Sequence, residues 1–183
     1  MNKQFPRLGL ALMIAATAWA ADWTEPVHVR QELKPVVSYR ARWDGAYLIV
    51  QATHDDGFHT YAMDNVKRAE EKLAGKQSLG IDSPTQINVS DGLLVEGGWQ
   101  QTPPKDLSKP ELRWYTWGYD GPAVFVAKAR RTGAGPARIA IRGQACTDTT
   151  CKNIDVTISL PLPEPGATPV ASDIDLKSLI PVR

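Results

Sequence analysis

The sequence predicts an all-β protein, an immunoglobulin-like β-sandwich with one short helix on its flank. Short runs of alternating apolar and polar residues recur along the chain, separated by Gly, Pro, Asn and Asp. Seven runs are predicted as strands: 36–43, 46–54, 85–89, 93–99, 123–129, 137–144 and 153–160. Segment 64–74 has helical spacing instead, with Asp64 at the N-cap position and Gly75 able to end the helix. Asp44-Gly45 and Asp56-Gly57 are predicted as hairpin turns.

The first 20 residues predict a secretory signal peptide. Lys3 and Arg7 precede an apolar run, and Ala-Trp-Ala at 18–20 has the pattern of a cleavage site. The apolar run is shorter than the roughly 20 residues that a membrane-spanning helix needs. We therefore expect a mature chain that begins at Ala21, is exported and soluble, and has no stable membrane insertion.

The exported part is expected to fold as one domain. We assign an N-terminal extension to 21–35, the sandwich to 36–162 and a Pro-rich tail to 163–183, whose apolar residues 174–182 could dock on the domain. The composition, 43% hydrophobic and 22% charged, is that of a globular protein. The formal net charge of +1 and the lack of a basic block argue against a nucleic-acid partner.

The only two cysteines, Cys146 and Cys151, lie close together between two predicted strands. Alternation along these strands places both side chains on the side away from the core, unless a β-bulge turns one of them. In an exported protein this pair can form a disulfide. Such a small ring stabilises a fold by only about 2 kcal/mol, and a short exposed ring is easily reduced. Spacing alone does not decide between a structural and a redox-active disulfide.

Segment 114–122, Trp-Tyr-Thr-Trp-Gly-Tyr-Asp-Gly-Pro, concentrates four aromatic rings in six residues and is predicted as a loop. Its rings could cover a reactive site, stack on a ligand or pack on the edge of the sandwich. The sequence leaves these alternatives open.

Taken together, several short motifs resemble the N-terminal periplasmic domain of the DsbD thiol:disulfide interchange family. They are Gly-Phe-His-Thr-Tyr at 57–61, Ser-Pro-Thr at 83–85, Tyr-Asp-Gly at 119–121, Gln-Ala-Cys at 144–146, and Cys151. The resemblance covers roughly residues 36–162. It implies a redox role for Cys146 and Cys151, a shielding cap that contains Trp117, Tyr119 and Asp120, and active-site neighbours at His59 and Tyr61.

The resemblance also implies a periplasmic location and an electron relay with no cofactor and no metal. The partners would be a thioredoxin-like or membrane reductase and, as possible targets, periplasmic disulfide proteins. The chain departs from the family pattern in its Cys-x4-Cys spacing, in Lys152-Asn153 after the second cysteine and in His59, which stands in place of a tyrosine. His59 is the first candidate to tune the thiols, before Asp120 and Asp148, and we expect Cys151 to be the partner-linked sulfur.

Two other functions remain open at this stage. A non-catalytic periplasmic binding module would use Trp99, Trp114, Trp117 and Tyr119 as an aromatic platform, with a structural disulfide. A metal-handling protein would use His59, Met63 and the thiol pair. A reduction potential would separate the redox relay from the binding module.

Overall fold

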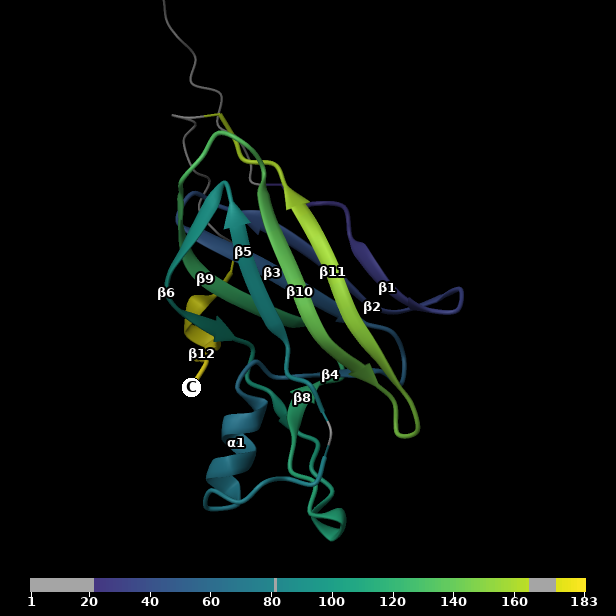
Figure 1. Cartoon of the computed structure of the whole chain (residues 1–183). Coiled ribbons are helices and arrows are strands. Elements are labelled where there is room, and N and C mark those ends of the chain that lie inside the picture. Colours follow the sequence, from purple (N-terminus) through teal and green to yellow (C-terminus); the bar gives the residue numbers. More distant parts are fainter. Residues whose placement is uncertain (1–21, 81, 165–173) are drawn as a thin grey trace, which may run out of the picture.

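Two β-sheets pack face to face in the computed structural model, which describes residues 22–80, 82–164 and 174–183 (Figure 1). In this part of the chain the first sheet has the order β1 (Val27–Gln31), β2 (Lys34–Trp43), β3 (Tyr47–His54), β9 (Ala123–Arg131), β6 (Leu93–Gln101) and β12 (Ile180–Pro181). The second has the order β11 (Cys151–Leu160), β10 (Ala137–Cys146), β4 (His59–Tyr61), β8 (Trp117–Tyr119) and β7 (Lys105–Asp106). Strand β5 (Gln86–Asp91) also pairs with β10, on the same edge as β4. The predicted all-β, immunoglobulin-like sandwich is confirmed.

The core lies between the two sheets because alternate residues of each strand point inward. Fully buried side chains come from both layers: Val37, Val50 and Phe125 from the first sheet, and Ile139, Ile141 and Ile158 from the second. Each contributes about 1.5–3 kcal/mol by leaving water. Intervening residues of β10, such as Arg138 and Arg142, are exposed. This alternation is the pattern from which the long strands were predicted.

The two predicted hairpin turns differ in outcome. Asp44-Gly45 joins β2 to β3, and the Asp44 carboxylate accepts hydrogen bonds from the backbone N–H groups of Ala46 (3.0 Å) and Tyr47 (2.6 Å). Asp56-Gly57 also forms a turn, but the strands that it connects, β3 and β4, belong to different sheets. The prediction of a hairpin there is wrong, because the turn carries the chain across the sandwich.

Helix α1 (Asn65–Lys72) occupies most of the predicted 64–74 segment. Asp64 is at the N-cap position, but its side chain makes no capping hydrogen bond. Its carboxylate binds Arg68 Nε (2.8 Å) and Gln101 Nε2 (2.6 Å) instead. The helix ends at Lys72, with Leu73 as its C-cap; Ala74 (φ 50°) and Gly75 (φ 83°) follow in left-handed backbone, and Gly75 N donates to Glu70 O (2.8 Å).

The segments on either side of the predicted sandwich carry strands of their own. Strand β1 lies in the segment 21–35 and pairs with β2. Beyond a 3-10 helix at Leu176–Ser178, β12 pairs with β6, and Val182 N donates to Trp99 O (2.9 Å). The tail residues after 173 therefore dock on the sandwich. The predicted signal peptide lies outside the described residues, and no described helix is long and apolar enough to cross a bilayer.

Candidate active site at the end of the β10–β11 hairpin

The β10–β11 hairpin carries both cysteines at its closed end. The ladder runs without a register shift from Ala137↔Leu160 to Cys146↔Cys151, and the two sulfurs are bonded. Beyond the pair, Thr147 N donates to Thr150 O (2.8 Å). Because hydrogen-bonded and non-hydrogen-bonded pairs alternate along an antiparallel ladder, the cysteines occupy a non-hydrogen-bonded position, where facing side chains approach most closely. Their Cα atoms are 4.0 Å apart.

The two cysteines share a face of the sheet but differ in exposure. Ile141 and Ala145 point into the core, so Cys146 and its partner Cys151 point to the outer face, as the sequence predicted. Cys146 is nevertheless 0% exposed, whereas Cys151 is exposed. A reagent or partner protein therefore meets the Cys151 sulfur first.

Strand β4 brings His59 and Tyr61 to the same face. His59 is the direct cross-strand partner of Cys146. The rings of His59 and Tyr61 meet edge to face with centroids 5.3 Å apart, and His59 Nε2 lies 3.3 Å from the Tyr61 hydroxyl. Burial is the main factor that lowers the pKa of His59 and raises the pKa of Tyr61. Burial therefore favours the neutral form of the ring beside Cys146.

A segment between β7 and β8, here called the β7–β8 loop (residues 107–116), closes on itself above this face. Leu107 N donates to Thr116 O (2.9 Å), and Lys109 N donates to Trp114 O (2.7 Å). Next to the 3-10 helix at its tip (Pro110–Leu112), the Lys109 ammonium forms an ion pair with Asp148 (3.0 Å), which lies in the turn after Cys146. The hairpin turn and the loop project from the same end of the sandwich (Figure 1).

The two ends of the β7–β8 loop show where it lies on the sheet. Its base is next to Trp117, whose carbonyl accepts from Ala62 N (2.9 Å), at the end of β4 away from the hairpin turn. Its tip reaches Asp148 in that turn. The loop therefore runs along β4 on the outer face. Tyr61 and Cys146, which point to this face, are both fully buried.

Trp117 and Tyr119, predicted to cap the sulfurs, lie on the opposite face. Tyr119 is the cross-strand partner of Thr60, which in turn pairs with the inward-facing Ala145. The Tyr119 ring packs in the core, edge to face with Phe125 at 5.7 Å, and Trp117 also packs against the core. The structure does not bring these two rings to the disulfide, and their segment is strand β8 rather than a loop. The prediction of a cap built from them is wrong because the facing of a short strand cannot be read without its register.

Asp120 follows Tyr119 at the rim of the site, where it is exposed and pairs with Lys105 (2.5 Å). This hydrogen bond lowers the pKa of Asp120. Behind it lies His54, which the sequence analysis did not single out. His54 Nδ1 lies 2.7 Å from Gly121 O, and Nε2 lies 2.8 Å from Thr60 Oγ1. Burial lowers the pKa of His54 as well.

The structure does not assemble the two alternative sites, the aromatic platform and the metal site, from the described residues. Trp99 belongs to β6 in the first sheet, and Trp117 and Tyr119 pack against the core, so the four rings do not form one platform. Met63 also packs against the core. Among the described residues, no group of three or more His, Cys, Asp or Glu side chains is placed to hold a metal ion.

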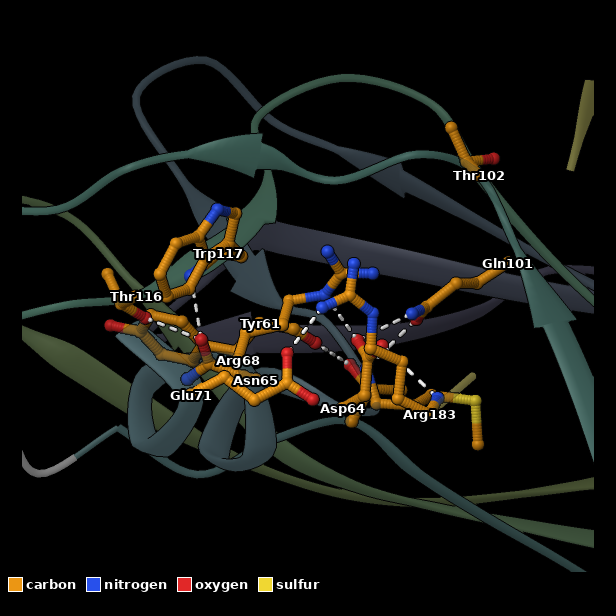
Figure 2. A network of polar contacts seen from close by, with 12 residues as sticks. Tyr61, Asp64, Asn65, Arg68, Glu71, Gln101, Thr102, Thr116, Trp117 and Arg183 are labelled. Carbon is orange, nitrogen blue, oxygen red and sulfur yellow. Dashed lines mark hydrogen bonds and ion pairs between the residues drawn. The ribbon is translucent and has the colours of Figure 1, made fainter. Parts of the chain in front are cut away.

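A polar network centred on the buried Gln101 and Asp64 side chains lies next to strand β8 (Figure 2). The Gln101 side chain, 0% exposed, donates to Asp64 (2.6 Å) and accepts from Met63 N (3.0 Å) and the Tyr119 hydroxyl (3.0 Å). Asp64 also accepts from Arg183 N (3.3 Å). Asp64 and Gln101 thus connect the docked C-terminal segment and the start of helix α1 to strand β8, which lies next to β4.

The similarity of this chain to known proteins is found in solved structures. No family model and no curated protein matches the sequence. The N-terminal domain of DsbD from Neisseria meningitidis, solved in the reduced form, is similar with a TM-score of 0.49 and 12% identity over 71% of this chain and 90% of that chain. The GAE domain of GGA2p from Saccharomyces cerevisiae is similar with a TM-score of 0.37 and 10% identity over 75% of this chain and 98% of that chain. With both TM-scores below 0.5, neither likeness carries an argument about function.

Proposed function

We propose that this chain is a periplasmic thiol:disulfide interchange protein whose redox pair is Cys146 and Cys151. The observation that carries the proposal is the unequal exposure of two disulfide-bonded cysteines at one hairpin end: Cys151 is exposed and Cys146 is fully buried. This arrangement suits a relay, because one sulfur can be attacked while the other leaves and later resolves the intermediate.

A structural role explains this disulfide less well. It links residues that are already direct neighbours at the end of a ten-pair ladder. By the loop-entropy relation, closing so short a ring stabilises the fold by about 2 kcal/mol. The long hairpin is already held to the core by Ile139, Ile141 and Ile158, which are buried.

In the first step, a thiolate of a reduced donor attacks the Cys151 sulfur. The Cys146–Cys151 bond breaks, its electron pair leaves with Cys146 as a thiolate, and a mixed disulfide joins the donor to Cys151. The donor's second thiol, as a thiolate, then attacks the donor's first sulfur in the mixed disulfide and releases Cys151 as a thiolate. The donor dithiol becomes a disulfide, and this chain gains two electrons and two protons.

His59 is the proposed proton acceptor in the return reaction. It is paired with Cys146 across the ladder, and cross-strand Cβ atoms lie about 4.5–5.5 Å apart. Because burial lowers its pKa, the ring is neutral and can take the proton of the Cys146 thiol. The exposed Cys151 thiolate attacks the disulfide of a target protein, and Cys146 then resolves that mixed disulfide.

The partners follow from this chemistry and from the motifs that resemble the DsbD family. The electron donor is a thioredoxin-like protein or a membrane reductase, and the acceptors are periplasmic disulfide proteins. No cofactor is needed, since the electrons travel as thiols. Residues 1–20 would export the chain. The shield over the buried sulfur is the β7–β8 loop, in place of Trp117 and Tyr119.

Equilibration of the purified protein in glutathione buffers of graded potential tests the proposal. Thiol trapping at each potential should give a reversible two-electron transition between roughly −120 and −270 mV, the range of exchange proteins, with the fold intact by circular dichroism. A midpoint below roughly −300 mV, or unfolding of the domain on reduction, would instead identify a structural disulfide.

A further inference from the structure

The Asp82 carboxylate holds two residues of the β7–β8 loop. Asp82 Oδ1 accepts from Trp114 Nε1 (3.1 Å), and Oδ2 accepts from Thr116 Oγ1 (2.9 Å). The Asn65 side-chain amide also donates to Oδ2, which ties the same carboxylate to the first residue of α1. Asp82 therefore joins the loop to the helix, and each of these hydrogen bonds is strengthened by its charge.

Further contacts fasten the segment just before Asp82 to the same stretch of the loop. Leu79 N donates to Arg113 O (3.1 Å), and Tyr115 N donates to Ser78 Oγ (2.9 Å). Gly80 has no room for a side chain, since a Cβ atom there would lie 2.0 Å from Trp114 Nε1. The indole of Trp114 thus packs directly on the backbone at Gly80, beside the carboxylate that binds it.

This junction is also connected to the disulfide strand. Ser83, next to Asp82, donates its N–H to the side chain of Gln144 (3.0 Å), which lies on β10 two residues before Cys146. The charge of Asp82 acts on both Tyr61 and His59. Asp82 is therefore bonded to the β7–β8 loop, while its neighbour Ser83 is bonded to the disulfide strand.

We propose that Asp82 is a positioning residue for the disulfide site: through Trp114 and Thr116 it holds the β7–β8 loop in the position that buries Cys146. The loop has a second fastening at its tip, where Lys109 pairs with the exposed Asp148. The Asp82 junction is the less exposed of the two, so it sets the resting position of the loop. The inference rests on the proposed function, since it concerns access to the same sulfurs.

Single-cysteine variants test the proposal. Cys151→Ser leaves only Cys146, and Cys146→Ser leaves only Cys151. In these two backgrounds Asp82→Ala should raise the iodoacetamide alkylation rate of Cys146 by at least about tenfold, the effect of losing roughly one charge-assisted hydrogen bond, and change that of Cys151 by less than about twofold. Asp155→Ala is the matched control, because Asp155 is a carboxylate of the same face that pairs with Arg142 (3.4 Å) away from the loop. It should leave both rates unchanged.

Two further variants keep the test decisive if Asp82→Ala fails to fold. Trp114→Phe removes the indole N–H but keeps an aromatic ring, and Gly80→Ala displaces the ring while leaving the carboxylate in place. Both should selectively raise the alkylation rate of Cys146, and Trp114→Phe combined with Asp82→Ala should add little to Asp82→Ala alone. Equal acceleration of both cysteines indicates general opening of the fold and overturns the proposal, as does an unchanged Cys146 rate. The assay needs no redox partner, so a failure of the proposed exchange activity in glutathione buffers is a separate result.

Discussion

Cys146 and His59 are direct partners across the β4–β10 ladder, and both lie on the outer face of the second sheet. The sulfur is fully buried and the imidazole has a pKa lowered mainly by burial. A neutral base thus lies beside the sulfur that a partner cannot reach, while Cys151, bonded to that sulfur, is exposed. This division of roles leads to the first prediction.

Cys146→Ser should trap a covalent complex with a thioredoxin-like partner, and Cys151→Ser should not. In Cys146→Ser the exposed Cys151 can form the mixed disulfide but has no neighbour to resolve it. In Cys151→Ser the remaining thiol belongs to the fully buried Cys146. Non-reducing gel electrophoresis measures the complex after incubation with a partner variant that lacks its own resolving cysteine and is added as its mixed disulfide with thionitrobenzoate, which leaves when Cys151 attacks. Trapping by Cys151→Ser alone would reverse the roles, and trapping by neither would favour a structural disulfide.

The stability of the fold should fall as the pH drops below about 6.5, the ordinary pKa of histidine. The pKa values of both His54 and His59 are lowered in the folded state, mainly by burial. The unfolded chain therefore binds more protons than the folded chain in this window, so stability rises with pH. Asp64, whose pKa is lowered from 3.8 by hydrogen bonds from Arg68 and Gln101, acts in the same direction only at lower pH.

Urea unfolding between pH 7.5 and 5 measures this dependence. The double variant His54→Gln, His59→Gln should show a flatter dependence of unfolding free energy on pH, with an unchanged denaturant slope. His54→Gln alone should account for part of the change, because His54 is the more enclosed ring, bound to Gly121 O and Thr60 Oγ1. A double variant with the full wild-type pH dependence would mean that other groups cause it.

The long strands could be predicted because each shows its own period. In β11, Ile154, Ile158 and Leu160 are buried between exposed residues, and this alternation predicts both the strand and the outward facing of Cys151. The same reasoning correctly placed Cys146 on the outer face. Strands of two or three residues, such as β4, β7 and β8, are too short to show a period.

The cover of the site could not be predicted, because it depends on contacts between residues far apart in the chain. Lys109 and Asp148 are 39 residues apart, and Asp82 and Trp114 are 32 apart. Nothing in the local sequence of these residues marks them as neighbours. The pairing of β8 with β4 shows that Trp117 and Tyr119 face the core, whereas Trp114 lies before β8 and binds Asp82.

Gln101→Leu should destabilise the fold by about 3 kcal/mol. The side chain is completely buried and makes hydrogen bonds with Asp64, Met63 N and Tyr119. A leucine fills similar space but leaves the buried Met63 N–H without its partner, at a cost of about 1–3 kcal/mol. It also removes one hydrogen bond each from Asp64, which keeps Arg68, and from the Tyr119 hydroxyl, which keeps Thr102 O. Gln100→Leu is the matched control, since Gln100 is the exposed neighbour on the same strand. Equal small effects of both substitutions in urea unfolding would show that the network contributes little.

Lys109→Ala should expose Cys146 without measurably changing the free energy of unfolding. The Lys109–Asp148 pair is largely solvent-exposed at the tip of the β7–β8 loop, and exposed pairs contribute little to stability. Yet it is the contact that brings this tip to the turn beside the disulfide.

Alkylation of Cys146 in the Cys151→Ser background measures the effect, and its rate should rise with Lys109→Ala. In the protein that keeps Lys109, the alkylation rate should also rise when the salt concentration is increased from 0.01 to about 1 M, because salt screens such ion pairs. The salt effect should vanish in Lys109→Ala. Arg142→Ala breaks another exposed pair of the same face, Arg142–Asp155, and should change neither the rate nor its salt dependence. If salt accelerates alkylation equally with and without Lys109, the ion pair does not hold the loop.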